Sequence, residues 1–291
     1  MGKANLNNTA YEERLGTDRM LPLVLRMAMP SVAAQIVNLL YNLVDRIYIG
    51  HIPGIGTDAL AGIGVTGAII ILISAFSAIV SGGGAPLAAI ALGQGDRKRA
   101  GLTLGNGFVL LLIFTLLTTT LTYLFMEPLL MFTGASENTV GYAKDYLSIY
   151  LLGTLFVETS VGLNTFINTQ GRPAIAMYSV LIGAVLNIIL DPIFIFVMGM
   201  GVRGAALATV ISQACSALWI VSFLTSKRAS LRLEFRYMRP DRNVISHILA
   251  LGVSPFIMAS TESLVGFVLN SSLEKFGDIN VSALAIMQRV G

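Results

Sequence analysis

The sequence predicts an all-α, polytopic membrane protein: a six-helix N-lobe followed by the first helix or two of a second six-helix lobe. Of its 291 residues, 55% are hydrophobic and only 12% are charged, against roughly 25% charged in an average globular protein. So few charges cannot coat a soluble fold of this size. Apolar stretches also recur at the length of about 20 residues that crosses ~30 Å of hydrocarbon.

The elements follow one another as apolar spans separated by loop residues. We expect a polar cytoplasmic tail over 1–21 without a removable signal peptide, then the N-lobe over 22–226. A basic inter-lobe linker over 227–242 and the beginning of a C-lobe over 243–291 complete the chain. The predicted spans are 22–49, 60–92, 101–126, 140–169, 173–199, 202–226 and 243–275, with an eighth beginning near Val281.

An internal repeat supports the two-lobe arrangement. Met29-Pro30-Ser31 at the start of the first span resembles Ser254-Pro255-Phe256 in the seventh, and the 58–61 segment resembles 282–285. Both matches are offset by about 225 residues, so six spans form one repeat. We therefore expect a complete protein of roughly 450 residues and twelve spans.

Lysine and arginine set the expected orientation. Fourteen of them lie in the tail, the even-numbered loops and the 227–242 linker, whereas three (Lys144, Arg203 and Lys275) lie on the other side. This bias places the N-terminus in the cytoplasm of a multi-pass inner or plasma membrane protein. It also explains the basic pI of 9.1 without nucleic acid as a partner.

Four acids fall at membrane depth, where a charge is costly and usually functional. They are Asp45, Glu158, Asp191 and Glu262. Asp45 ends a polar face of the first span that also carries Gln35, Asn38 and Asn42. Glu158 is either a third functional acid or a residue beside a wider aqueous cavity.

Several side chains of spans four to six share this oxygen-rich character. Asn187 and Asp191 lie one turn apart in span five, Asn164 and Asn168 in span four, and Thr209 and Gln213 in span six. Hard cations bind carboxylate, amide and hydroxyl oxygens. A Na⁺ site at Asp45, Asn187 and Asp191, or a proton site on the two carboxyls, is therefore expected. Isolated amides such as Asn168 are better explained as hydrogen bonds between helices.

Other motifs are excluded by their context. Gly62–Gly67 and Gly199–Gly204 fit G-x-G-x-x-G, but one lies inside a span and the other between two spans, without a strand. Ser81-Gly82-Gly83-Gly84 lacks the Lys of a P-loop and indicates close helix packing. The single Cys215 excludes an internal disulfide and a Cys-based zinc site. No hydrolase, metalloprotease or kinase motif is present, so we expect no enzyme and no cofactor beyond a coupling ion.

Three blocks of sequence resemble the multidrug and toxic compound extrusion (MATE) family of cation-coupled antiporters. The strongest runs from Asn168-Thr169-Gln170-Gly171-Arg172-Pro173 through the segments 187–192 and 201–209. A second joins Pro30, Asp45 and Gly50 to Ala59-Leu60-Ala61, and a third is Gly93-Gln94-Gly95-Asp96. The resemblance covers essentially all of 22–291.

The resemblance implies two six-helix lobes around a cleft and export of cationic or amphipathic drugs in exchange for Na⁺ or H⁺. It implies a multi-pass protein in the lipid bilayer that is monomeric when complete. The span-seven acid of the family matches Glu262 here. The family's N-lobe cation site matches Asp45, Asn164, Asn187, Asp191 and Thr209.

Two other functions compete with efflux as explanations of the same residues. A flippase of lipid-linked precursors shares the architecture, but its groove should carry more cations for pyrophosphate, and Arg46 is the one basic residue deep within a complete span. A membrane-embedded enzyme using Asp45 and Asp191 as an acid pair lacks the Gly-x-Gly-Asp context of an intramembrane aspartyl protease.

Overall fold

A computed structural model describes residues 20–287 of the chain; the tail residues 1–19 and residues 288–291, Arg289 among them, lie outside the described part. Within it the chain is a bundle of long helices. Their bounds are α2 Met20–Gly50, α3 Gly56–Ile79, α4 Ala85–Gly93, α5 Arg97–Leu124, α6 Met126–Phe132, α7 Val140–Thr169, α8 Pro173–Pro192, α9 Val202–Thr225, α10 Arg242–Glu274 and α11 Asp278–Met287.

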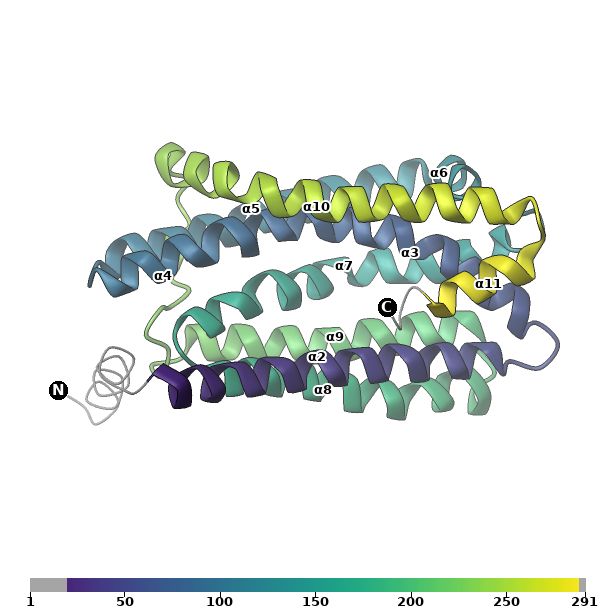
Figure 1. Ribbon diagram of the computed structural model, residues 1–291, viewed down its shortest axis with the longest axis horizontal. Helices are drawn as coiled ribbons and strands as arrows, with labels where there is room; N and C mark the ends of the chain where they lie inside the picture. Colours follow the sequence, from purple (N-terminus) through teal and green to yellow (C-terminus); the bar gives the residue numbers. More distant parts are fainter. Residues whose placement is uncertain (1–19, 288–291) are drawn as a thin grey trace.

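The helices form two layers with α7 between them (Figure 1). One layer contains α2, α8 and α9, which pack against one another. The other contains α3, α5 and α10, and α7 contacts α9 on one side and α3 and α5 on the other. Six segments of the described chain are long and apolar enough to cross a membrane: 56–93, 97–124, 140–169, 173–197, 202–225 and 242–274. α2, with 31 residues, also has the length of a span.

The predicted spans agree with the observed helices to within a few residues at most ends. The second span is one continuous helical segment, because the π-helical residues Val80–Gly84 join α3 to α4. The short helix α6 was not predicted: seven residues between the third and fourth spans are too few to show a clear helical period.

Glycine brings the backbone of α10 against this π-helical segment. A Cβ at Gly83 would overlap the carbonyl oxygen of Ile248, and a Cβ at Gly252 would overlap that of Ile79. Gly82 lies against the ring of Pro255 in the same way. The prediction that Ser81–Gly84 serves close helix packing is therefore confirmed.

The second G-x-G-x-x-G segment is a turn between α8 and α9, as expected. Gly199 and Gly201 have φ of 66° and 55°, a region that side chains with a Cβ rarely adopt. Gly204 packs against the backbone of Phe194. Glycine here satisfies backbone geometry rather than binding a phosphate.

The segment between α9 and α10 folds back against one end of the bundle. Leu231 and Leu233 are buried in the apolar core that includes Phe166 and Leu104. The backbone N–H of Leu231 donates to Oε1 of Gln170 at 3.0 Å.

Asn106 of α5, which is fully buried, fixes the far end of the same segment. Its Nδ2 donates to the carbonyl of Tyr237 at 3.2 Å, and its Oδ1 accepts from the N–H of Asp241 at 2.8 Å. The basic residues 227–242 therefore lie at the same end of the bundle as Arg97, Lys98 and Arg99 at the start of α5.

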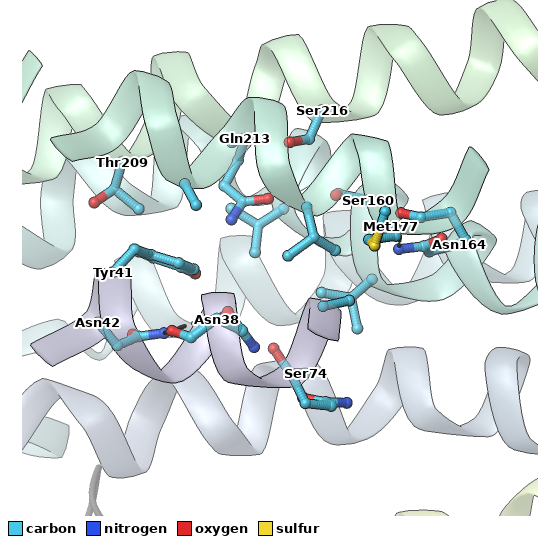
Figure 2. Close-up of a pocket in the computed structure, with 18 of the residues that line it drawn as sticks. Asn38, Tyr41, Asn42, Ser74, Ser160, Asn164, Met177, Thr209, Gln213 and Ser216 are labelled. Carbon is cyan, nitrogen blue, oxygen red and sulfur yellow. Dashed lines mark hydrogen bonds between the residues drawn. The ribbon is translucent and has the colours of Figure 1, made fainter. Parts of the chain in front are cut away.

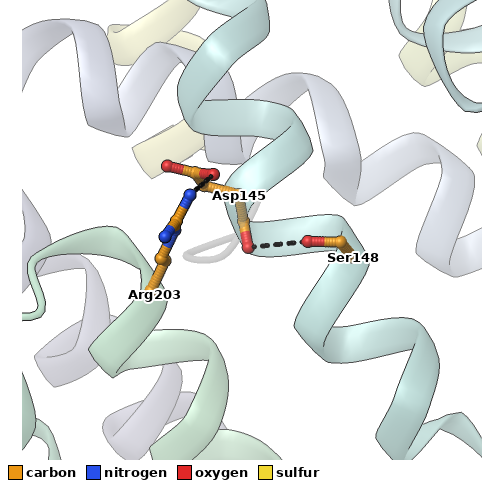
Figure 3. Close-up of polar contacts among 3 residues, drawn as sticks. All are labelled: Asp145, Ser148 and Arg203. Carbon is orange, nitrogen blue, oxygen red and sulfur yellow. Dashed lines mark hydrogen bonds and ion pairs between the residues drawn. The ribbon is translucent and has the colours of Figure 1, made fainter.

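Ion pairs join helices at the opposite end of the bundle. Arg203 Nη2, in the first turn of α9, donates to Asp145 Oδ1 in α7 at 2.8 Å, as Figure 3 shows. Lys144 pairs with Glu127 of α6 at the same distance. Both pairs are exposed, so solvent screens them and they add little to stability.

Candidate functional site

A polar cavity of about 440 Å³ opens among α2, α3, α7, α8 and α9. Amide and hydroxyl side chains dominate its wall, and Figure 2 shows them facing one another from different helices. Among the described residues that line it, none is Lys or Arg, and Asp45 is the only acid. The lining includes Gln35, Asn38, Tyr41, Asn42, Asp45, Ser74, Ser160, Asn164, Asn168, Thr209 and Gln213.

The two predicted acids meet at the wall of this cavity. Asp191, on α8 and fully buried, lies close enough to Asp45 on α2 for the two carboxyl groups to interact electrostatically. Two ionised carboxylates in a buried site repel each other, and a proton or a cation between them relieves this repulsion. The pair is therefore built to share one positive charge, either a proton or a cation.

Asn187 and Thr209 complete the cluster beside the pair. Asn187 Nδ2 donates to Asp191 Oδ1 at 3.2 Å and to Thr209 Oγ1 at 3.4 Å. Asn187 Oδ1 and Asp191 Oδ2 are buried and have no hydrogen-bond partner among the described residues. Orphaned buried oxygens of this kind suit a hard cation.

Asn164 lies apart from these four residues. Its Nδ2 donates to Ser179 Oγ at 3.2 Å and points toward the Ala176 carbonyl at 3.4 Å. Ser179 precedes Asn187 by two turns of α8, which is about 12 Å along the helix. In Figure 2, Asn164 and Thr209 lie at opposite ends of the cavity. The structure thus brings together Asp45, Asn187, Asp191 and Thr209, and places Asn164 elsewhere on the same wall.

The family of the chain follows from comparison with known proteins. The model of the MatE family matches residues 30–193, more than half of the chain and the part that contains Asp45, Asn187 and Asp191. The chain belongs to the MatE family. The resemblance found in the sequence to multidrug and toxic compound extrusion proteins is confirmed.

Curated and solved relatives agree with this family. The chain is 26% identical over 267 residues to the multidrug export protein MepA of Staphylococcus haemolyticus, which covers 92% of the chain and 59% of that protein. It is 24% identical over 271 residues to MepA of Staphylococcus aureus, with the same coverage. The chain therefore spans about three-fifths of the length of the curated relatives it matches.

Two solved structures of MATE transporters share the fold. A structure of the MATE multidrug transporter DinF-BH superposes with a TM-score of 0.90 at 32% identity, covering 96% of this chain and 62% of that one. An inward-facing multidrug resistance MATE family transporter of the MOP superfamily superposes with a TM-score of 0.81 at 27% identity, covering 92% and 61%.

The remaining membrane acids of this MatE chain lie outside the cluster. Glu262 is on an exposed face of α10 and is not part of the cavity wall, so its predicted role as a C-lobe coupling acid stays a prediction. Glu158 is 1% exposed and bonds to α3 instead. Arg46, the one basic residue deep within a complete span, is buried with 8% exposure.

Sequence reasoning missed the contribution of α3 to the site. Ser74 lines the cavity from α3, a helix whose other serines and threonines gave no polar face to detect. No periodic signal marks a single serine among apolar residues, so only the packing of α3 on α7 reveals it.

Proposed function

We propose that this chain forms the N-terminal lobe of a secondary active transporter that exports cationic or amphipathic compounds in exchange for Na⁺ or H⁺. The observation that carries the proposal is the close approach of two acids, Asp45 and Asp191, at a polar cavity whose wall includes Asp45. The multidrug export proteins and multidrug transporters among its relatives support the substrate class.

The geometry suits an exchange in which ion and drug compete for the same negative charge. When the pair holds a proton or Na⁺, Asp45 offers the cavity no net attraction for a cationic drug. When the pair is vacant, its charge faces a cavity without Lys or Arg in its described lining, and a cation is attracted. Binding one ligand therefore weakens binding of the other, which is the condition for antiport.

The donor set fits a Na⁺ ion as well as a proton. Two carboxylates, the Asn187 amide oxygen and the Thr209 hydroxyl are hard oxygen donors. No group of three or more His, Cys, Asp or Glu side chains that could hold a metal ion occurs within residues 20–287, so the donor set offers little to a softer metal.

A flippase of lipid-linked precursors is disfavoured by the lining of the cavity. Pyrophosphate carries several negative charges and is usually held by Arg or Lys. Asp45 in the described lining would repel it, and Lys and Arg are absent from that lining.

Efflux from membrane vesicles made with the complete protein tests the proposal. The vesicles are inverted, a gradient of H⁺ or of Na⁺ is imposed, and movement of a fluorescent cationic dye is followed. Wild type should move the dye under at least one gradient. Asp45→Asn and Asp191→Asn should each lose about tenfold or more of the rate, because Asn resembles a permanently neutral acid.

Asp145→Asn is the matched control. It makes the same chemical change in α7, at an exposed ion pair that is not part of the cavity lining, and should transport like wild type. Unimpaired dye movement by both Asp45→Asn and Asp191→Asn would contradict the proposal, whichever ion drives transport.

A further inference from the structure

Glu158 is a buried acid that the cluster around Asp191 does not use. It lies inside the α7 span with 1% of its surface exposed. Removing a carboxylate from water into such surroundings is unfavourable unless other groups compensate it. Its presence on a membrane-spanning helix therefore calls for a specific role.

Two serines of α3 hold the carboxyl group of Glu158. Ser74 Oγ donates to Oε1 at 2.8 Å, and Ser77 Oγ donates to Oε2. Ser74 and Ser77 are three residues apart, so they share one face of α3. Both carboxyl oxygens are thus held by neutral donors from one neighbouring helix.

The contacts that the structure gives the carboxyl group of Glu158 within residues 20–287 are the two serine hydroxyls. The ionisable side chains of the surroundings belong to α7 itself and to the helices packed against it. Several are committed to other contacts, such as Asp191 with Asp45 and Arg203 with Asp145. These side chains are Tyr142, Lys144, Asp145, Tyr146 and Tyr150 of α7, Asp58 of α3, Arg97, Lys98, Arg99 and Tyr123 of α5, Glu127 of α6, Tyr178 and Asp191 of α8, and Arg203 and Cys215 of α9.

The polar cavity lies on the other side of Ser74. Ser74 is part of the cavity wall, and Figure 2 shows it facing the cavity across from side chains of α7 and α9. Glu158 itself does not line the cavity, whereas its neighbours Val157 and Ser160 do. One hydroxyl group therefore stands between the buried carboxyl and the space where water and substrate enter.

We propose that Glu158 is a second proton-binding site of this lobe and exchanges its proton with the polar cavity past Ser74. Loading moves a proton from a hydronium ion in the cavity to a carboxylate oxygen, which forms one O–H bond and leaves one water molecule. Release reverses the step. The expected effect of Glu158 on transport rests on the proposed exchange of drug for ion. The protonation of Glu158 can be observed without any transport.

A purely structural role predicts different behaviour. Ser74 and Ser77 could be joined to α7 equally well by a neutral Gln, which offers an amide oxygen to accept and an amide N–H₂ to donate. If Glu158 only joined the two helices, Glu158→Gln would behave like wild type. If it carries a proton, Glu158→Gln folds normally but cannot bind or release one.

Infrared difference spectroscopy of the purified complete protein detects the proton directly. The protein carries isotope-labelled glutamate, so that the C=O band of a protonated Glu separates from that of Asp191. We expect a labelled carboxylic-acid band that appears and disappears as pH is stepped in wild type and is absent in Glu158→Gln. Thr154→Ala, at another buried polar residue of α7, should keep the band.

Proton-driven dye movement in vesicles gives the second measurement. Glu158→Gln should lose about tenfold or more of the rate while dye binding to the purified protein changes less than about twofold, because a neutral amide binds no proton. Glu158→Asp, which restores a titratable group, should recover part of the rate. Ser74→Ala should slow proton exchange more than Ser77→Ala, since Ser74 alone of the two lines the cavity.

The outcomes separate this proposal from the proposed function. A labelled band that stays unchanged across the pH range in which the protein remains folded overturns the proton site. So does a band that Na⁺ removes at constant pH, which would show a cation site instead. Wild-type protein that moves no dye under any gradient contradicts the efflux function, while the infrared band still decides whether Glu158 binds a proton.

Discussion

The amide of Asn187 donates a hydrogen bond to Asp191 Oδ1 at 3.2 Å, one turn further along α8. The donated bond fixes the side chain of Asn187 so that its own Oδ1 stays free of hydrogen-bond partners among the described residues, in a buried position. One residue thus orients the acid and offers an additional oxygen to a bound ion.

Replacing Asn187 by Ala should therefore harm both coupling and stability. Loss of the buried bond should lower the free energy of unfolding by about 1–3 kcal/mol, measured by thermal unfolding in detergent. The rate of ion-driven dye movement should fall by a larger factor than the amount of folded protein does. Asn168→Ala is the control, since Asn168 lies outside the cluster, and it should do less. Equal losses in both variants would show that Asn187 has no special role.

Gly83→Ala should weaken the packing of α10 on the lobe. The added Cβ would overlap the carbonyl of Ile248, and strain of this kind typically costs about 1–3 kcal/mol. Gly67→Ala is the matched control on α3, because no other side chain or neighbouring helix lies within 4 Å of its Cβ position. We expect a lower midpoint of thermal unfolding for Gly83→Ala alone. A midpoint unchanged from wild type would contradict the observed contact.

Asn106→Ala should loosen the segment between α9 and α10. It removes the bonds to Tyr237 and Asp241 and leaves two partly buried backbone groups without these partners. Trypsin should then cleave faster at the basic residues of this segment, as followed by gel electrophoresis over time. Asn280→Ala, which loses only a local bond to Phe276, should be cleaved like wild type. Equal cleavage rates would show that Asn106 does not hold the segment.

Cysteine labelling in cells tests the predicted orientation. In a Cys215→Ser background, Arg236→Cys should react with a membrane-impermeant maleimide only after the cells are permeabilised. Glu137→Cys, exposed at the opposite end of the bundle, should react in intact cells. The reverse pattern would place the basic segment outside and contradict the orientation inferred from Lys and Arg counts.

The spans could be predicted from sequence because each is a long apolar run bounded by glycine, proline or charge. The site was only partly predictable. Helical periodicity identifies which helix faces carry Asp45, Asn187, Asp191 and Thr209. It does not show at which level along the axis a residue of one helix meets the next helix. Asn164 was therefore grouped with residues that the packing of α7 on α8 separates from it by two turns.

Glu158 illustrates the remaining limit of sequence reasoning. The sequence shows that Glu158 is an acid within an apolar span, where a charge is unfavourable. Its hydrogen-bond partners, however, lie more than eighty residues earlier in the chain. Only the packing of α3 against α7 brings Ser74 and Ser77 to it. Contacts between distant residues of this kind depend on the tertiary arrangement, and two serines on one face of an apolar helix do not indicate which helix they contact.

The contact between α3 and α10 also determines which parts of the molecule can move independently. Side chains between two helices can change rotamer and let the helices slide, whereas Gly83 and Gly252 leave backbone directly against backbone. The first half of α10 should therefore travel with α3 as one rigid body. We therefore expect the boundary between moving parts to lie beyond this contact along the chain, and not at the 227–242 linker where the sequence predicts that one lobe ends and the next begins.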